Sequence, residues 1–160
     1  MSVKVLFVCL GNICRSPTAE GVFLKLVAEA GLSKRIEVDS AGTAGWHQGR
    51  APDPRTIAVA KEHGYNLSML RARQVLAADF EKYDYILAMD SENLRNLTQL
   101  KPIAHTGFLG LFLAFGLQKN YCEVPDPYHG DAKDFALVVS LAEDAARGLL
   151  DHICKNHNLN

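Results

Sequence analysis

Residues 3–17, "VKVLFVCLGNICRSP", decide the fold. The first six are almost wholly apolar and rich in β-branched side chains, which predicts a strand buried on both faces of a parallel sheet. The following residues have the composition of a loop, and Pro17 opens a stretch with helical periodicity. The segment therefore predicts a strand, a loop and a helix, with two cysteines and an arginine in the loop.

Further strands and helices alternate along the rest of the chain. Strands are expected at residues 36–40, 83–90 and within 108–113, and helices at 17–31, from 54 to about 63, at 91–100 and near the C-terminal end. Ser16 is a candidate N-cap of the first helix, and Asp53 with Pro54 marks the start of the second. This order predicts an α/β fold, a three-layer sandwich with a four-stranded parallel sheet flanked by helices.

The composition is that of an ordinary globular protein. Of 160 residues, 48% are hydrophobic and 22% charged, so we expect a single domain over residues 1–160. The formal net charge is −1 with no basic stripe, which argues against a nucleic-acid partner. No apolar run approaches the roughly 20 residues that a membrane span requires. Four irregularly spaced cysteines favour reduced thiols and a cytoplasmic location. The expected oligomeric state is a monomer.

Metal and nucleotide sites are not expected from the motifs. The six histidines and four cysteines include no Cys-x-x-Cys and no His-x₃-His spacing of the kind that zinc sites use. A Walker-type nucleotide loop requires a lysine and a second glycine, which "GNICRSP" lacks. We therefore expect neither a metal nor an organic cofactor.

The loop after the first strand has the features of an oxyanion site. Ligands of parallel α/β folds bind beyond the carboxyl ends of the strands, where this loop lies. Gly11 and Asn12 tolerate positive φ, so the loop can curl until its N–H groups point inward, beside a helix N-terminus. Arg15 adds a planar guanidinium that grips two oxygens. The same positive field favours a thiolate at Cys9, which would be a nucleophile aimed at phosphorus.

The whole string "VLFVCLGNICRSPTAE" closely resembles the signature of the low-molecular-weight protein tyrosine phosphatases. The resemblance continues in the family's order through "DSAGT", "GRAPDPR", "ARQV", "DYILAMD" and "VPDPYHGD". It implies a phosphate-binding loop after the first strand and hydrolysis of phosphotyrosine and aryl phosphates through a phosphocysteine intermediate. The implied partners are phosphotyrosine-containing protein substrates, with inorganic phosphate as the product.

The resemblance assigns roles to individual residues. Cys9 is the implied nucleophile, Arg15 binds phosphate, and Ser16 donates a hydrogen bond to the Cys9 thiolate. Asp126 of "PDPY" is the implied general acid and base; a protonated leaving group departs more easily, and prolines on both sides stiffen this carboxyl. The remaining implied residues are Leu10, Gly11, Asn12, Ile13 and Cys14 of the loop, Ser40 of the supporting network, and Trp46 and Tyr128 of the substrate rim.

Several sequence features keep alternatives open. Cys14 is implied as a redox partner that forms a reversible disulfide with Cys9, against the alternative of a passive loop residue. His129 stands where many family members have a second tyrosine, which puts regulation by phosphorylation there in doubt.

Three other functions fit the same scaffold. Arsenate reductases also need a closely spaced downstream cysteine pair, which this chain lacks. Phosphoarginine phosphatases tend to have threonine where this chain has Ile13. A non-catalytic phosphoprotein-binding module is the third alternative, although Cys9, Arg15 and Asp126 are all present.

Overall fold

The computed structural model describes residues 1–159 and confirms the predicted α/β fold. Four parallel strands form one sheet in the order β2-β1-β3-β4. The strands are β1 (Val3–Cys9), β2 (Ile36–Gly42), β3 (Tyr85–Ala88) and β4 (Phe108–Leu111). The helices are α1 (Arg15–Glu29), α2 (Pro54–Glu62), α3 (Asp79–Lys82), α4 (Ser91–Leu100) and α5 (Ala132–His157), with a 3₁₀ turn, η1, at Phe112–Phe115.

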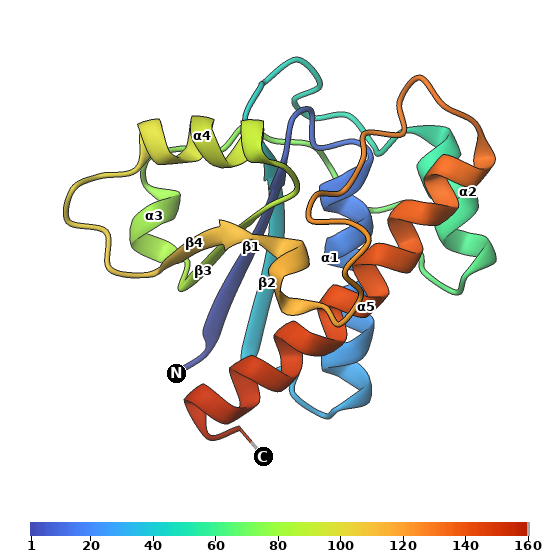
Figure 1. Ribbon diagram of the computed structural model, residues 1–160. Coiled ribbons are helices and arrows are strands. Elements are labelled where there is room, and N and C mark those ends of the chain that lie inside the picture. Colours follow the sequence, from blue (N-terminus) through green and yellow to red (C-terminus); the bar gives the residue numbers. More distant parts are fainter. Residues whose placement is uncertain (160) are drawn as a thin grey trace.

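Helices cover both faces of the sheet, and β1 shows why (Figure 1). Its side chains alternate between two apolar clusters, as the pleat of a strand requires. Val5 and Phe7 belong to the cluster that includes α1 and α5, whereas Leu6 and Val8 belong to the cluster that includes α3 and α4. A strand buried on both faces reads as a continuous apolar run, which is the pattern that predicted it.

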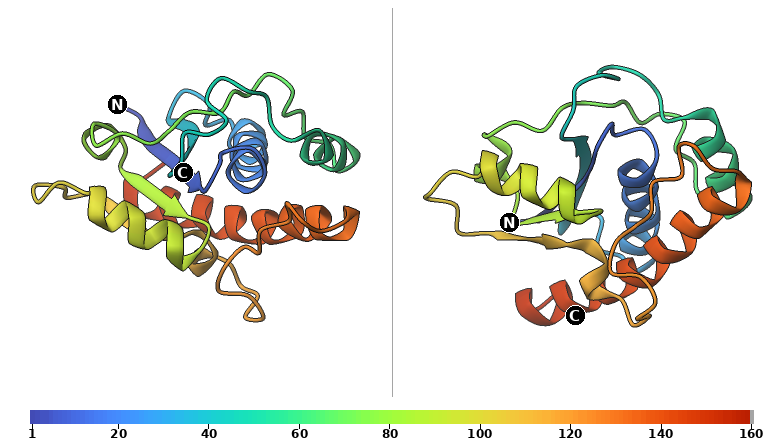
Figure 2. Two further views of the ribbon diagram at one scale, coloured as in Figure 1. Left: turned by 90° about the horizontal axis from the view of Figure 1, so that it is seen from above. Right: turned by 45° about the horizontal axis from the view of Figure 1, so that its top comes forward.

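The carboxyl end of β1 lies where the strand order reverses. The chain places β2 on one side of β1 and then crosses to place β3 on the other. Loops that follow β1, β2 and β3 therefore gather at one end of the sheet, and the two chain ends lie at the opposite end (Figures 1 and 2). This is the position where open α/β sheets bind ligands.

The start of α1 differs from the sequence prediction. The helix begins at Arg15, so its N-cap position is Cys14 and no side chain caps it. The predicted N-cap Ser16 is therefore wrong: Ser16 lies inside the first turn and is fully buried. Its hydroxyl is used by Asn12 and Cys9 instead, which leaves the helix N-terminus open toward the loop.

Two other segments differ in detail. The four-residue helix α3 was not expected, because so short a helix has no measurable apolar period. A strand was expected within residues 108–113; Phe108–Leu111 forms that strand, and the turn η1 begins directly after it at Phe112. Asp53 and Pro54 do start a helix, and the Asp53 side chain accepts a hydrogen bond from the N–H of Arg55.

Residues 1–159 contain neither a candidate membrane-spanning helix nor a candidate metal site. None of the helices there combines the length and apolar character needed to cross a membrane. Within the same residues, no group of three or more His, Cys, Asp or Glu side chains is placed to hold a metal ion.

Candidate active site

Asn12 fixes the shape of the loop between β1 and α1. Its φ of 58° is in the left-handed region, which asparagine tolerates better than most residues. The buried side chain donates from Nδ2 to Ser16 Oγ at 2.8 Å and to Ser40 Oγ at 3.0 Å. Its Oδ1 accepts a hydrogen bond from the N–H of Arg73 at 3.0 Å. One side chain thus ties the loop to α1, to β2 and to the segment before α3.

The loop backbone turns its carbonyl groups toward neighbouring segments. The carbonyls of Cys9 and Leu10 accept from the N–H groups of Thr43 and Ala44, and the carbonyl of Ile13 accepts from Asp53. None of the N–H groups of residues 11–14 donates to an acceptor within residues 1–159. Together with the uncapped N-terminus of α1, these groups form an anion-binding cradle.

Gly42 at the end of β2 permits this curvature. A Cβ built there would lie 2.6 Å from the carbonyl oxygen of Leu10 and 3.1 Å from the N of Asn12. Both are backbone atoms of the loop, so any larger residue would push the loop away from the sheet. The sequence reasoning did not single out this glycine, although it lies inside the quoted "DSAGT".

Cys9 lies at the base of the cradle. Its side chain is 2% exposed, and its Sγ is 3.0 Å from Ser16 Oγ. The Ser16 hydroxyl accepts from Asn12, and its own proton has two acceptors in reach, the sulfur of Cys9 at 3.0 Å and the carbonyl of Ala41 at 3.4 Å, of which the sulfur is the nearer. A hydroxyl donor at this distance stabilises a thiolate more than a neutral thiol.

Arg15 crosses from α1 to the opposite wall of the site. Its guanidinium is buried, and NH1 donates to Asp90 Oδ2 at 2.6 Å and to the carbonyl of Val124 at 3.1 Å. Burial alone would lower the pKa of Arg15, but the charges of Cys9 and Asp90 raise it above the usual value. Arg15 is therefore a fixed cation directly beside the cysteine.

Asp126 lies on the loop that leads into α5. Its carboxylate is half-exposed, 3.8 Å from Arg15 NH2, and accepts from the N–H of Tyr128 at 3.2 Å. The loop is anchored before it by the hydrogen bond from Val124 N–H to the Met89 carbonyl, and after it by the capping box of α5 that starts at Asp131. The carboxyl thus lines the cavity on an anchored loop and remains half-exposed.

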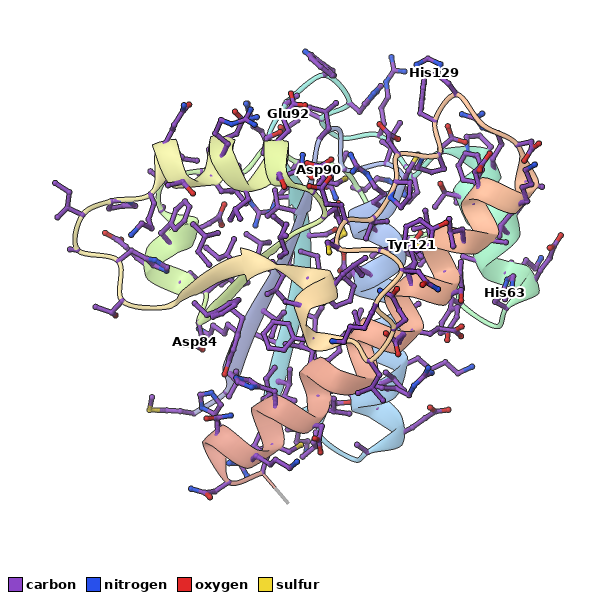
Figure 3. All side chains as sticks on the ribbon, viewed as in Figure 1. His63, Asp84, Asp90, Glu92, Tyr121 and His129 are labelled. Atoms are coloured by element: carbon purple, nitrogen blue, oxygen red, sulfur yellow. The ribbon has the colours of Figure 1, made fainter. Side chains whose placement is uncertain are left out.

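A cavity of about 280 Å³ opens above Cys9. Trp46 and Tyr128, both exposed, contribute to its lining, as the resemblance implied for a rim. Two histidines that the sequence reasoning did not assign also line it. His47 lies against the loop, where a Cβ on Gly11 would be 3.0 Å from its ring, and His129 lies at the upper end of the molecule in Figure 3.

Cys14 also lines the cavity but differs from Cys9 in its surroundings. It is 5% exposed and packs with apolar side chains of α2 and α5. Burial raises the pKa of the Cys14 thiol to about 12. Cys14 is therefore a neutral thiol near neutral pH. All four cysteines of the chain are unpaired.

The structure brings nearly all of the predicted residues to one place. The loop from Cys9 to Ser16, with Asp126, Trp46 and Tyr128, surrounds the cavity or lies beneath it, and Ser40 supports it from below. Asp90, the partner of Arg15, was missed. Its available signal was its position directly after a strand of the sheet, at the same end as Cys9; Asp84, before that strand, lies at the other end in Figure 3.

Glu20 was also missed. It is a buried charge within the otherwise apolar face of α1, and it accepts from Ser40 Oγ at 2.6 Å. Its signal in the sequence was its place one turn after Ser16, among apolar residues.

A cysteine beneath an anion-binding loop, beside a buried arginine and an overhanging carboxyl, defines a cysteine-dependent phosphoric monoester hydrolase. The family model described as "Low molecular weight phosphotyrosine protein phosphatase" matches residues 4–159. The chain belongs to this family and is an enzyme of the protein phosphatase class, which confirms the resemblance inferred from the sequence.

Individual relatives agree with this assignment. The low molecular weight phosphotyrosine protein phosphatase of Schizosaccharomyces pombe is 47% identical over 84% of this chain and 86% of its own length. A protein tyrosine phosphatase structure from Entamoeba histolytica superposes with a TM-score of 0.93 at 38% identity, covering 98% of this chain and 99% of the other. A Drosophila arginine phosphatase is also similar, with a TM-score of 0.88 at 32% identity, covering 94% and 97%.

Proposed function

We propose that this protein hydrolyses phosphotyrosine in protein substrates, and aryl phosphates, through a phosphocysteine intermediate. The observation that carries the proposal is the cavity in which Cys9, Arg15 and Asp126 meet: thiol at the base, guanidinium at the wall and carboxyl above. The phosphoryl group of the substrate takes the place of the anion in the cradle, held by the loop N–H groups and Arg15.

In the first step the Cys9 thiolate attacks phosphorus. The S–P bond forms as the bond between phosphorus and the phenolic oxygen breaks, and Asp126 gives its proton to that oxygen. Arg15 and the loop N–H groups stabilise the charge on the equatorial oxygens. Asp126 is suited to this role because its loop is anchored on both sides while its side chain lines the cavity and stays half-exposed.

In the second step water attacks phosphorus and Asp126 takes a proton from that water. The S–P bond breaks, inorganic phosphate leaves, and the electron pair returns to Cys9 as a thiolate. The hydroxyl of Ser16, 3.0 Å from Sγ, stabilises the departing sulfur. No metal or organic cofactor takes part in either step of the proposed reaction.

The rim selects an aromatic leaving group. Trp46 and Tyr128 offer flat apolar surfaces on which a phosphotyrosine ring stacks. The guanidinium of Arg55 lies 5.3 Å from the centre of the Tyr128 ring and pairs with Asp53, which supports this side of the rim. The phosphotyrosine named in the family and in most relatives supports this substrate class.

Three further features belong to the proposal. Residues 1–160 act as one domain, and the protein is a monomer. Cys14 forms a reversible disulfide with Cys9 under oxidising conditions and so protects the nucleophile. The requirement for a reduced Cys9 supports a cytoplasmic location.

The test is turnover of p-nitrophenyl phosphate with a chelator present. The expected result is hydrolysis by the wild type that Cys9→Ser abolishes, with burst formation of a phosphoenzyme that Cys9→Ser lacks. Asp126→Ala is expected to slow aryl phosphates with poor leaving groups most. Activity that survives Cys9→Ser, or an equal loss for good and poor leaving groups in Asp126→Ala, contradicts the respective role.

A further inference from the structure

Glu20 is a buried acid that the proposed reaction does not use. It lies on α1 one turn after Ser16, and only 6% of the residue is exposed. Its Oε1 accepts a hydrogen bond of 2.6 Å from Ser40 Oγ on β2. A buried carboxyl is costly unless it is hydrogen-bonded, and Ser40 is its one hydrogen-bond partner among residues 1–159, so the position calls for a physical reason.

A continuous chain of hydrogen bonds joins Glu20 to the cysteine. Ser40 Oγ accepts from Asn12 Nδ2 at 3.0 Å. The same amide nitrogen donates to Ser16 Oγ at 2.8 Å, and Ser16 Oγ is 3.0 Å from Cys9 Sγ. All five residues that these bonds join are buried, so solvent does not compete for them; the one other acceptor near Ser16 Oγ within residues 1–159 is the carbonyl of Ala41, at 3.4 Å.

The chemistry of Glu20 and of the Asn12 amide determines which group donates in each of these hydrogen bonds. An ionised carboxylate only accepts, so it takes the proton of Ser40, whose oxygen is then left to accept from Asn12. The amide of Asn12 is held with its nitrogen toward the two serines, because its oxygen accepts from the N–H of Arg73. Ser16 therefore accepts from Asn12, and the nearer acceptor for its own proton is Cys9 Sγ at 3.0 Å rather than the carbonyl of Ala41 at 3.4 Å.

We propose that Glu20, as a carboxylate, is a positioning residue that holds Ser40 as a donor to it, strengthens the hydrogen bonds of Ser40, Asn12 and Ser16, and so favours the Ser16 proton on Cys9. The proposal rests on the proposed role of Cys9 as nucleophile. Glu20 touches neither the cavity nor the substrate, and it acts only through Ser40.

Burial and the charges around Glu20 place its ionisation near neutral pH. Burial raises its pKa to about 7, the hydrogen bond from Ser40 lowers it, Asp39 on β2 raises it, and Arg73 lowers it. Arg73 is itself shared with Asp39 and Asp79, which limits its effect on Glu20. Glu20 thus changes between acid and carboxylate near neutrality. The strength of the hydrogen bonds that join it to Cys9 changes with its charge.

The decisive experiment compares kcat/KM of wild type and Glu20→Gln across pH. Glutamine keeps the shape and an acceptor for Ser40 but never ionises. We expect the ratio of wild type to variant to be near one at about pH 5, where both side chains are neutral. The ratio should rise on the order of threefold to tenfold at about pH 8, because a hydrogen bond to a charged group is about twice as strong as a neutral one.

Two controls separate this effect from a structural one. Glu29→Gln removes an exposed charge from the same helix, and its ratio is expected to stay at one throughout. In a Ser40→Ala background Glu20→Gln should have no further effect on kcat/KM at any pH, since the link to Asn12 is already cut. If Ser40→Ala does not fold, the pH dependence of the first ratio decides alone.

The outcomes are distinguishable from a failure of the proposed function. Turnover that Cys9→Ser abolishes, with a ratio that does not change with pH, overturns the role of Glu20 and leaves the nucleophile intact. Additive effects of Glu20→Gln and Ser40→Ala also overturn it. Turnover that survives Cys9→Ser overturns the proposed function itself.

Discussion

Replacing Asp90 by asparagine tests whether the pair between Arg15 and Asp90 positions the arginine. The two carboxylate oxygens of Asp90 accept hydrogen bonds from different partners. Oδ2 accepts from Arg15 NH1 at 2.6 Å, and Oδ1 accepts from the N–H of Asn93 at 2.7 Å as the N-cap of α4. Asparagine is also a good N-cap residue but carries no charge, so Asp90→Asn tests the ion pair with Arg15 while the cap of α4 is kept.

The magnitude follows from the burial of the two partners. Breaking a fully buried ion pair by removing one partner costs roughly 3–5 kcal/mol. Here the Asp90 side chain is 22% exposed, and Arg15 keeps the Val124 carbonyl and the more distant Asp126. We therefore expect a loss of about 2 kcal/mol in the free energy of unfolding, or roughly 4–8 °C in Tm for a chain of this size.

Activity should fall more steeply than stability. Arg15 acts on charge in the transition state, and loss of one positioned donor typically costs about 100-fold or more in kcat. Because Asp90→Asn misplaces Arg15 without removing it, we expect a smaller loss in kcat/KM, about tenfold to 100-fold.

The assay is urea unfolding together with p-nitrophenyl phosphate turnover, with Asp90→Ala as the companion variant. Alanine also removes the cap, so it should cost about 1 kcal/mol more than asparagine. The reasoning is refuted if Asp90→Asn matches the wild type in kcat/KM. It is equally refuted if asparagine and alanine lower kcat/KM to different extents, because the cap has no role in placing Arg15.

Three further predictions concern other parts of the molecule. Glu20 has a folded-state pKa of about 7 against an ordinary 4.5, so the folded chain holds its proton more tightly and stability falls as pH rises between these values. Glu20→Gln should remove that fall and be more stable by up to about 3 kcal/mol at pH 8 in urea unfolding; a difference that does not vary with pH contradicts this. Cys14, with its pKa near 12, should resist iodoacetamide at neutral pH in the native protein, as peptide mass spectrometry would show, whereas exposed Cys122 should react. Gly148→Ala, which would press a Cβ on the carbonyl of Phe115, should lower the free energy of unfolding by about 1–3 kcal/mol, and an unchanged value would show that α5 can move.

Local sequence patterns predicted those parts of the structure that local physics determines. The apolar run of β1, the helix start at Asp53 and Pro54, and the helix expected near the C-terminal end each correspond to an observed element. The loop after β1 was predicted as an anion site because Gly11, Asn12 and Arg15 lie in one short segment. Glycine and asparagine there carry conformational information that can be read without a structure.

Local sequence patterns could not predict the contacts between segments that are distant in the sequence. Asp90 meets Arg15 only because β3 pairs with β1 in a register that brings Ala88 opposite Val8. Glu20 meets Ser40 only because α1 packs against β2. In both cases the residue was visible as a charge beside apolar neighbours, but its partner depended on strand order. Ser16 was misassigned for a related reason: its hydroxyl is committed to Cys9 and Asn12 rather than to the helix end.

The loop that carries Asp126 is pinned on both sides, which has a consequence for exchanging loops between relatives. Val124 is fixed by Met89 and Arg15, and the capping box at Asp131 fixes the start of α5. Only residues 125–130 span the interval, so the carboxyl has little freedom to travel. The preceding segment, residues 116–123, lies outside these two anchors. Replacing it with the corresponding segment of another member of the family is therefore expected to leave the acid in place above the cysteine.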